Sequence, residues 1–300
     1  MNNKPYCLAL GFFDGVHIGH GALLRRVKEV AAEKGLTPGV ITFDSHPLSM
    51  VTGKTVPLIN SPADRAGIIR REYGIDDVIF LHFDSRTMHM PWDAFIVNLK
   101  NEFDAAHLVA GHDFHFGDKG AGNPELLQQK CAELGLGCDI IAPVTLDGVL
   151  SSSTHIRKLL EQGEIERANA FLGHPHVLTD HVRTGYKLGR TLGAPTINMC
   201  FEPGVLIPRR GVYATRVYLP DGSEHAGVTN IGVRPTVDTS TAAVTAETFI
   251  LDYQGNLYGQ TVRIAFYKLL GQEIKFESVE ALKAQIQRDA QSVRAFFAAT

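Results

Sequence analysis

The sequence predicts two domains of different fold class: an α/β domain built on a parallel sheet, followed by a β-rich domain that ends on a helix. Three observations lead to this expectation. The chain has 300 residues, of which 44% are hydrophobic, so it is long enough for two buried cores. Its first half alternates short apolar runs with helical patterns, which is typical of crossovers between parallel strands. After about residue 178, short β-rich runs separated by turns are typical of a barrel or sandwich.

Five short apolar runs in the first half are expected to form the buried strands of the sheet. The segments between them carry apolar residues at helical spacing, and several begin with an N-cap residue or a proline. The expected strands are residues 6–10, 39–43, 77–82, 107–110 and 139–143, and the expected helices are residues 21–34, 61–73, 91–102, 124–134, 153–162 and 165–172. The last two helices are expected to complete the first domain.

The second half is expected to consist mainly of β-structure. Residues 211–219, 243–252 and 261–269 are β-rich runs, and turn sequences such as Asp221-Gly222 separate them. Residues 278–297 form an amphipathic pattern, so the domain is expected to end on a helix packed against its strands. We place the boundary near residues 178–183, which gives domains 1–178 and 179–300.

Composition and charge exclude several classes of function. The net charge is -3 and there is no long run of Lys or Arg, so the chain lacks the charge pattern of a non-specific nucleic-acid binder. Its start does not resemble a signal peptide, and no apolar run reaches membrane-spanning length. Cys7, Cys131, Cys138 and Cys200 form no C-x-x-C pair, which fits reduced thiols. We therefore expect a soluble cytoplasmic protein with small-molecule partners, while the oligomeric state stays open.

The loop after the first expected strand has the sequence GFFDGVHIGH, residues 11–20. It places two histidines at a helix N-terminus on the carboxyl edge of the sheet, where α/β sheets bind ligands. Its glycines let a phosphate chain approach the backbone, and free amides and imidazole donors can meet charge that develops on an α-phosphate. The candidate residues are Gly11, Phe12, Asp14, Gly15, His17 and His20.

Two alternatives exist for these histidines. At this spacing they are also compatible with a zinc site or with a simple helix start. His112 and His115 invite the same metal interpretation, but the residues between and after them fit a shaped loop better.

Further polar strings follow other elements of the first half. TFDSHP (42–47) ends the second strand, GHDFHFG (111–117) follows the fourth, and SSTHIR (152–157) opens a helix. The first two strings are expected to face one crevice. Ser152, Ser153 and Thr154 are candidates for binding phosphate, and Arg157 could neutralise a pyrophosphate leaving group. Taken alone, Ser153 could be only a helix cap and Arg157 only a solvated charge.

In the second half, TGYKLGRTLGAPTIN (184–198) is a glycine-rich loop that enters a strand. Thr196 and Asn198 share one face of that strand, and their oxygens suit Mg²⁺ that bridges ATP phosphates. The alternative is a plain β-turn. Glu247 could accept the proton of a substrate hydroxyl, or it could be an exposed strand carboxylate. The candidate nucleotide-binding residues of the loop are Gly185, Lys187, Gly189 and Arg190.

These strings together carry a resemblance. In the first half, FDGVHIGH, GHDFHFG and SSTHIR resemble the FMN adenylyltransferase half of bacterial flavin synthetases. In the second half, GRTLGAPTIN, GVYA (211–214), GVTNIGVRPT (227–236) and the block that begins at Glu247 resemble riboflavin kinases. About eight blocks follow one another in the family's order over roughly residues 6–290. The chain is thereby identified as a member of the bacterial bifunctional riboflavin kinase/FMN adenylyltransferase family.

The resemblance implies a Rossmann-like nucleotidyltransferase domain followed by a six-stranded riboflavin-kinase barrel with a C-terminal helix. It implies that the chain phosphorylates riboflavin to FMN and adenylylates FMN to FAD, with ATP as co-substrate, Mg²⁺ as cofactor and pyrophosphate as product. The implied catalytic residues are His17, His20, Arg157 and Glu247, the implied metal ligands are Thr196 and Asn198, and the implied flavin-binding residues are Asp113, Phe114, Phe116, Asn230 and Arg234.

Three positions depart from the family pattern. Gly21 stands in place of Gln, Ala194 in place of Phe, and Gly271 in place of an Arg that usually precedes the acidic Glu273. Two other functions therefore remain as alternatives: an adenylyltransferase with an impaired kinase half, and a non-catalytic flavin or nucleotide sensor. The retained histidines and Glu247 argue against a sensor, because a protein that only binds has no use for a base.

Overall fold

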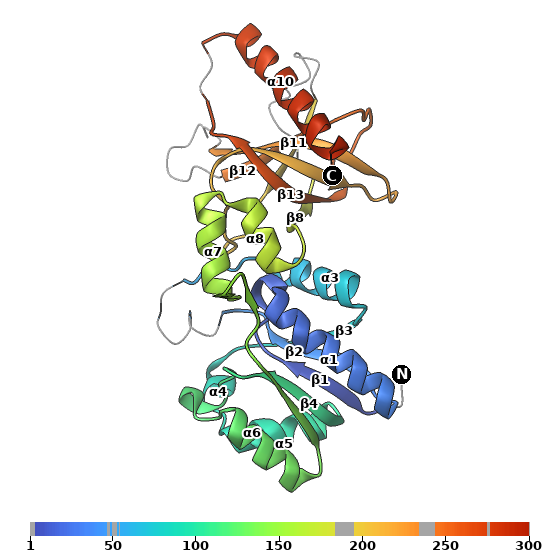
Figure 1. Cartoon of the computed structure of the whole chain (residues 1–300), viewed down its shortest axis with the longest axis vertical. Helices are drawn as coiled ribbons and strands as arrows, with labels where there is room; N and C mark the ends of the chain where they lie inside the picture. Colours follow the sequence, from blue (N-terminus) through green and yellow to red (C-terminus); the bar gives the residue numbers. More distant parts are fainter. Residues whose placement is uncertain are drawn as a thin grey trace. The chain divides into compact units, whose positions relative to one another are not determined.

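The computed structural model describes residues 4–46, 49, 53, 55–183, 195–233, 244–274 and 277–299 (Figure 1). Its contacts divide the chain into two compact units, Met1–Ser153 and Thr154–Thr300, and each unit is described by itself. Both fold classes expected from the sequence are present.

The first unit is built on a five-stranded parallel sheet with the order β3-β2-β1-β4-β5. The central strand β1 pairs with β2 on one side and with β4 on the other. The chain therefore reverses its direction of progress between β1 and β4, which makes this the point where open α/β sheets bind ligands. The strands are β1 (Tyr6–Leu10), β2 (Thr37–Phe43), β3 (Asp77–Leu81), β4 (Ala105–Gly111) and β5 (Gly137–Ile141).

Helices flank this sheet, and their ends follow local sequence signals. Ser61 caps α3 by accepting a hydrogen bond from the Asp64 amide, and Asn123 caps α6 in the same way. On one face of the sheet, α5 and α6 pack against a core that includes Leu8 and Leu10. The elements are α1 (Ile18–Lys34), α3 (Pro62–Tyr73), α4 (Ser85–Met88), α5 (Trp92–Glu102), α6 (Pro124–Leu134), the 3-10 turns η1 (Asp14–Val16) and η2 (Asp118–Gly120), and the hairpin β6 (Thr145–Leu146) and β7 (Val149–Leu150).

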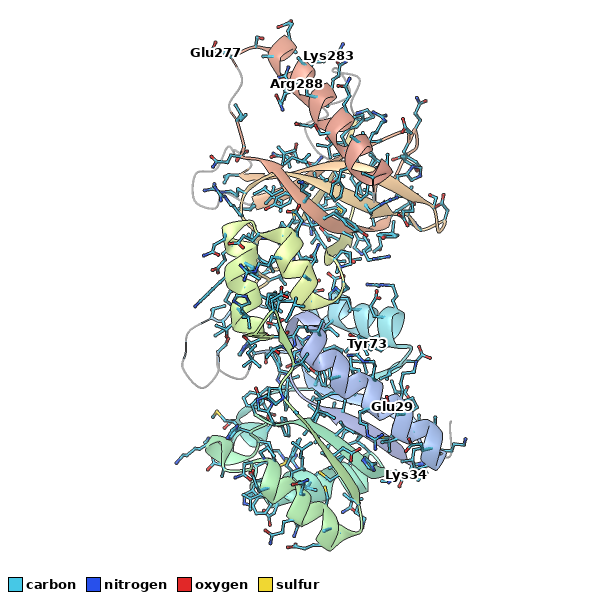
Figure 2. The ribbon with its side chains drawn as sticks, viewed as in Figure 1. Glu29, Lys34, Tyr73, Glu277, Lys283 and Arg288 are labelled. Carbon is cyan, nitrogen blue, oxygen red and sulfur yellow. The ribbon has the colours of Figure 1, made fainter. Side chains whose placement is uncertain are left out.

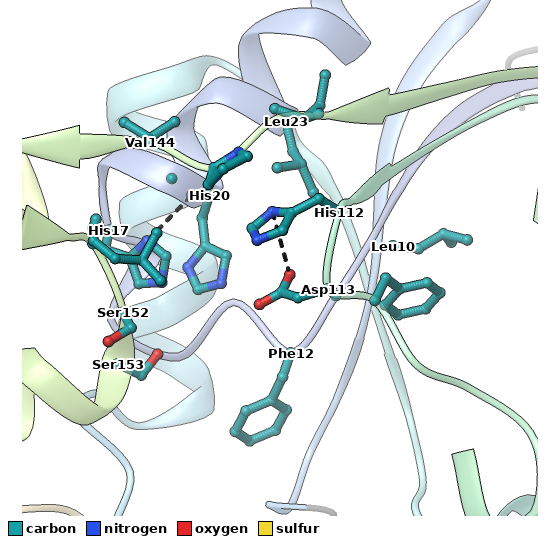
Figure 3. A pocket seen from close by; sticks show the side chains of 18 of the residues that line it. Leu10, Phe12, His17, His20, Leu23, His112, Asp113, Val144, Ser152 and Ser153 are labelled. Carbon is teal, nitrogen blue, oxygen red and sulfur yellow. Dashed lines mark hydrogen bonds and ion pairs between the residues drawn. The ribbon is translucent and has the colours of Figure 1, made fainter. Parts of the chain in front are cut away.

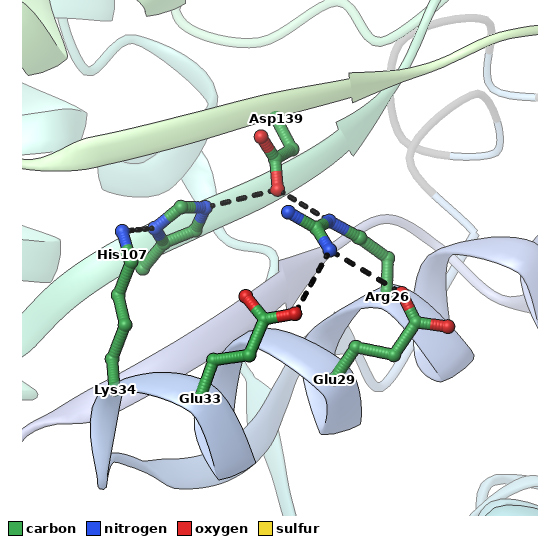
Figure 4. Close-up of polar contacts among 6 residues, drawn as sticks. All are labelled: Arg26, Glu29, Glu33, Lys34, His107 and Asp139. Carbon is green, nitrogen blue, oxygen red and sulfur yellow. Dashed lines mark hydrogen bonds and ion pairs between the residues drawn. The ribbon is translucent and has the colours of Figure 1, made fainter.

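A polar cluster ties α1 to β4 and β5 (Figure 4). The buried His107 ring lies between Lys34 Nζ, 3.2 Å from its Nδ1, and Asp139 Oδ2, 3.2 Å from its Nε2. Arg26 Nε donates to the same Asp139 carboxylate at 2.7 Å. Burial lowers the pKa of His107, so the ring stays neutral between its two charged neighbours. His107 lies toward the start of β4, whereas the ligand-binding edge of the sheet lies at the strand's end.

The second unit is an antiparallel sheet of six strands that curls into a half-barrel. Its order is β8-β13-β10-β11-β12-β9, and an isolated bridge joins Arg183, just after the edge strand β8, to Asn198 of the edge strand β9. The Arg183 amide donates to Asn198 O at 2.8 Å, and the Cys200 amide donates to Asp180 Oδ2 at 2.8 Å. The strands are β8 (His176–His181), β9 (Thr196–Cys200), β10 (Gly211–Tyr218), β11 (Glu224–Val233), β12 (Val244–Ile250) and β13 (Thr261–Gly271).

Three helices accompany the barrel: α7 (Ser153–Gln162), α8 (Ile165–Leu172) and α10 (Val279–Ala298). The terminal helix α10 buries Ala290 and Val293 against Ala214 and Val228 of the barrel. Its polar side carries Lys283 and Arg288 (Figure 2). The expected C-terminal helix is therefore present, with Ser278 as its N-cap.

The expected domain boundary differs from the division of contacts. Position 178 lies inside β8, which pairs with β13 along its whole length. The helix α8 contacts β13, and Asn169 in that helix donates to Phe266 O at 2.8 Å. Helices α7 and α8 therefore group with the barrel, although we expected them to complete the first domain. The exact boundary stays a prediction.

Candidate functional sites

The loop between β1 and α1 adopts an unusual backbone conformation. Phe13, Gly15 and Val16 have φ angles of 54°, 81° and 46°. A left-handed conformation is costly for a β-branched residue such as Val16, and it persists only where surrounding contacts fix it. Here Asp14 supplies two of those contacts: its Oδ1 accepts from the Ile59 amide at 2.8 Å, and its carbonyl accepts from Ser153 Oγ at 2.8 Å. Strain held in this way is typical of functional loops.

His17 forms the N-cap of α1 with its side chain. Its Nδ1 accepts a hydrogen bond from the His20 amide at 3.3 Å. A neutral His17 must therefore carry its proton on Nε2. A Cβ atom at the intervening Gly19 would lie 3.0 Å from two atoms of the His17 ring, so a larger residue there would require that ring to shift. The geometry of the cap therefore favours glycine between the two histidines.

The His20 ring stacks on the His17 ring, with centroids 3.6 Å apart and planes at 19°. Burial lowers the pKa of His20 well below its usual value, and the neighbouring His17 and Arg65 lower it further. His20 is therefore neutral at physiological pH. Its Nδ1 is buried and has no hydrogen-bond partner in the part of the chain that the structure describes.

These two histidines line a cavity of about 420 Å³ at the carboxyl ends of β1 and β4 (Figure 3). Its walls come from the end of β2, from the loops after β1, β4 and β5 and from the start of α7. The volume is in the range of small-molecule sites. The lining includes the sequence-predicted residues Gly11, Phe12, His17, His20, Asp113, Phe114, Ser152 and Ser153. Of the string 42–47, Phe43 lines the cavity.

The two phenylalanines of the loop after β4 lie in different surroundings. Phe114 lines the cavity, and its ring stacks on Phe116 at a centroid distance of 5.2 Å. Phe116 itself is buried in the core, where it packs against Phe95. We expected both rings to bind flavin, but only Phe114 reaches the cavity, because the Phe116 side chain points to the core side of the loop. Asp113 projects from the same loop with an exposed side chain.

Thr154 and Arg157 lie in α7, after the cavity-lining residue Ser153. Thr154 is exposed in the first turn, and the half-buried Arg157 lies one turn inside the helix. Both belong to the second contact unit, so their distance from the cavity stays a prediction.

A second constellation lies on three neighbouring strands of the barrel. Asn198 of β9 is the cross-strand partner of Glu247 in β12, and Glu247 is in turn the partner of Asn230 in β11. Directly opposed residues share one face of a sheet, so the three side chains form a row. Thr196 lies on the same face, two residues before Asn198. The sequence alone did not predict that Asn230 lies next to Glu247, because it does not show the register of paired strands.

Both asparagines of this row hold unused oxygens. Asn198 Oδ1 and Asn230 Oδ1 are buried and accept no hydrogen bond from any described residue. Glu273 also reaches this region, since a Cβ atom at Gly232 would overlap Glu273 Oε1 and approach Asn230 Nδ2 to 3.0 Å. Sequence analysis did not include Glu273 among the candidate site residues.

Five of the predicted kinase-half residues lie outside the described residues: Gly185, Lys187, Gly189, Arg190 and Arg234. Their roles stay predictions. In the described ranges no three His, Cys, Asp or Glu side chains come together as a metal site. In the same ranges, none of the helices has the length and apolar character needed to cross a membrane.

Comparisons with known proteins were made for the whole chain. The family model described as FAD synthetase matches residues 1–155, and the model described as riboflavin kinase matches residues 172–297. Relatives named bifunctional riboflavin kinase/FMN adenylyltransferase include those of Listeria monocytogenes (36% identical, over 97% of this chain and 92% of the relative) and Pseudomonas fluorescens (37%, over 97% and 93%). The Escherichia coli K12 relative of that name is 34% identical over 98% of this chain and 93% of its own.

A solved structure from Streptococcus pneumoniae, described as a macrolide-efflux protein, is also similar, with a TM-score of 0.84 and 26% identity over 98% of this chain and 95% of that one. Two findings decide the assignment. The two family models match in order along the chain, and the relatives are more than 30% identical over nearly their full length. The chain belongs to the family of bifunctional riboflavin kinase/FMN adenylyltransferases.

Proposed function

We propose that this chain makes FMN from riboflavin and FAD from FMN, with ATP as co-substrate in both steps, and that each step has its own site. Adenylyl transfer takes place in the cavity beside His17 and His20. Phosphorylation of riboflavin takes place at the row around Glu247. The observation that carries the proposal is the stacked histidine pair at the α1 N-terminus, which opens into a cavity of about 420 Å³.

In the adenylyl transfer, a phosphate oxygen of FMN attacks the α-phosphorus of ATP while the bond to pyrophosphate breaks. Negative charge then builds on the α-phosphate oxygens. The Nε2–H of His17, the neutral ring of His20 and the positive end of the α1 helix dipole can meet this charge. Arg157 is assigned to the leaving pyrophosphate. Donors fixed before the reaction need no rearrangement during it.

The other residues of this site bind the two substrates. Gly11 and Gly15 let phosphate approach the backbone, and Phe12 and Asp14 shape that loop. Ser152, Ser153 and Thr154 offer hydroxyls and amides at the start of α7. Asp113 and the Phe114 ring bind the flavin or nucleotide from the opposite wall, and Phe116 supports the Phe114 ring from the core.

In the kinase step, the 5′-hydroxyl oxygen of riboflavin attacks the γ-phosphorus of ATP, and the bond to ADP breaks. Glu247 accepts the hydroxyl proton. Asn230 and Arg234 bind the flavin beside it. Gly185, Lys187, Gly189 and Arg190 form the loop that binds the ATP phosphates.

Magnesium fits the donors of the barrel. When bound, Mg²⁺ neutralises polyphosphate charge in reactions of this type. Thr196 and Asn198 would hold it through a hydroxyl and an amide oxygen, which are ligands that this ion accepts. The Asn198 Oδ1 is buried with no partner among the described residues, so it is available for such a role. We further propose a cytoplasmic protein whose partners are riboflavin, FMN and ATP, with no nucleic acid and no membrane.

The test uses the full chain with riboflavin, ATP and Mg²⁺, and it separates the flavin products. We expect both FMN and FAD. His20→Ala should abolish FAD formation while FMN still forms, and Asn198→Ala should stop FMN formation while added FMN is still converted to FAD. Each variant is the matched control for the other.

Other outcomes would favour the alternatives. FAD formed only from added FMN would indicate an impaired kinase half, and neither product would indicate a sensor. Loss of both products in either folded variant would contradict separate sites.

A further inference from the structure

We propose that Arg65 is a positioning residue for adenylyl transfer, which holds the Phe12 segment of the histidine loop in its reactive geometry. This inference rests on the proposed function of the cavity. Arg65 is not among the residues that line the cavity, so it acts through residues that do.

Arg65 connects the ends of two central strands. It lies in α3, and its Nη1 donates to the Phe12 carbonyl at 3.0 Å and to the Phe43 carbonyl at 2.8 Å. The same nitrogen contacts Thr42 Oγ1 at 3.1 Å, and that hydroxyl donates to the Phe12 carbonyl at 2.8 Å. One guanidinium nitrogen therefore fixes the carbonyls that follow β1 and end β2. Both Phe12 and Phe43 line the cavity.

The guanidinium also fixes an aromatic ring of the cavity wall. Its carbon lies 4.5 Å from the centroid of the Phe12 ring, and the Phe80 ring lies 5.8 Å away. The Phe12 ring also makes an edge contact with the His46 ring, at a centroid distance of 4.7 Å. Cation–π attraction of this kind is stronger away from water. The Phe12 backbone and its ring are thus held by the same side chain.

Burial makes Arg65 a costly residue for a purely structural role. It is 0% exposed and is the largest fully buried side chain among the described residues. Its Nε and Nη2 have no hydrogen-bond partner there. An apolar side chain of similar volume often stabilises a protein as well as a buried charge does. The presence of a buried cation here therefore favours a function that an apolar residue could not supply.

The charge also acts on the reaction site. Burial lowers the pKa of Arg65 to about 10, so it remains a cation near neutral pH, and Asp14 and Asp44 favour that charged form. Its positive charge contributes to the lowered pKa of His20, after burial and His17. Arg65 therefore supports both the shape of the loop and the neutral state of the histidine that faces the phosphates.

The experiment compares Arg65→Met and Arg65→Lys with the wild type in the full chain. For each we would measure kcat and KM for FAD formation from FMN and ATP, FMN formation from riboflavin, and thermal stability. A misplacement of about 1 Å can cost roughly a hundredfold in rate, so we expect Arg65→Met to lower the kcat of FAD formation by about that factor. KM for ATP should change far less, and kinase turnover should stay within about twofold.

Two further variants, Arg70→Met and Thr42→Val, serve as the control and as a second test. Arg70→Met, the same change at an exposed arginine of α3, should leave FAD formation unchanged. Arg65→Lys keeps the charge but not the planar fork, so it should recover part of the lost kcat. Thr42→Val keeps the shape of Thr42 and removes the hydroxyl shared by Arg65 and Phe12, so it should lower the same kcat by a smaller factor.

The proposal would be overturned by an Arg65→Met variant with normal kcat for FAD, or by equal loss of both activities together with stability. If Arg65→Met fails to fold, Thr42→Val decides, and unchanged FAD formation in that variant would overturn the proposal. A failure of the proposed function itself looks different: His20→Ala would then keep making FAD.

Discussion

His176 in the barrel predicts a measurable dependence of stability on pH. Its ring is 1% exposed, and neither ring nitrogen has a hydrogen-bond partner among the described residues. Burial, followed by the charge of His174, lowers its pKa from 6.5 to about 3. Between these values the unfolded chain binds a proton that the folded chain does not, so stability falls as the pH falls. From pH 7.5 to pH 5 this one residue should cost roughly 2 kcal/mol of unfolding free energy.

The perturbation is His176→Phe, which keeps an aromatic ring near Phe266 but cannot titrate. We expect the wild type to lose about 2 kcal/mol more than the variant between pH 7.5 and pH 5. Urea denaturation followed by far-UV circular dichroism reports both units, and fluorescence of Trp92, the single tryptophan, reports the first unit, so the barrel is followed by the dichroism change that the fluorescence does not share. His181→Phe, at an exposed position of the same strand, is the matched control. Parallel pH profiles for wild type and His176→Phe would refute the reasoning.

Two further predictions concern the sites, and a third concerns the stability of the barrel. Because the pKa of His20 lies well below 6.5, the kcat of FAD formation from FMN should not fall as the pH is lowered through 6.5. A fall in kcat centred at pH 6.5 that is absent in His20→Gln would contradict this. Glu247→Gln should lower the kcat of FMN formation by roughly a hundredfold while riboflavin binding, followed by flavin fluorescence, survives. Unchanged kcat with weaker binding would make Glu247 a substrate anchor. Thr229→Val breaks two buried hydroxyl contacts, at 2.8 Å to Thr215 and 2.9 Å to Thr248. It should lower the unfolding free energy in urea by about 1–3 kcal/mol. A loss near zero would mean that these hydroxyl contacts do not stabilise the pairing of the strands.

Local signals predicted most of the fold. The helix 124–134 begins at a proline after the Asn123 cap and ends before Gly135, and the structure has the same bounds. The strand β8 (His176–His181) was not predicted, and the expected domain boundary at residues 178–183 overlaps it. Its partner β13 lies far along the chain, and no turn connects the two. Pairing of this kind is fixed by tertiary contacts, which a local pattern does not contain.

The candidate sites were predicted unequally. The histidine loop was found because its glycines and histidines are neighbours in sequence. Arg65 was missed because arginines in a helix are usually solvated, and α3 carries two more at Arg70 and Arg71. One signal was present: Arg65 is three and four residues before Ile68 and Ile69, so it shares the buried face of the helix. A charged residue on an apolar face is worth examining as part of a site.

Two departures from the family pattern differ in their physical setting. At Gly21 a Cβ atom would overlap the Tyr73 hydroxyl from α3 and lie 3.2 Å from Arg25, so a larger residue there requires the ends of these side chains to move. Tyr73, labelled in Figure 2, therefore occupies the space that a larger residue 21 would need. At Gly271 no described residue lies within 4 Å of a Cβ atom, so no neighbour in the described ranges replaces the missing arginine at that position. The first departure is matched by Tyr73, which fills the space beside Gly21 in the adenylyltransferase half. The second leaves open space at the end of β13, two residues before Glu273, and is the one that can alter the kinase half without disturbing the fold.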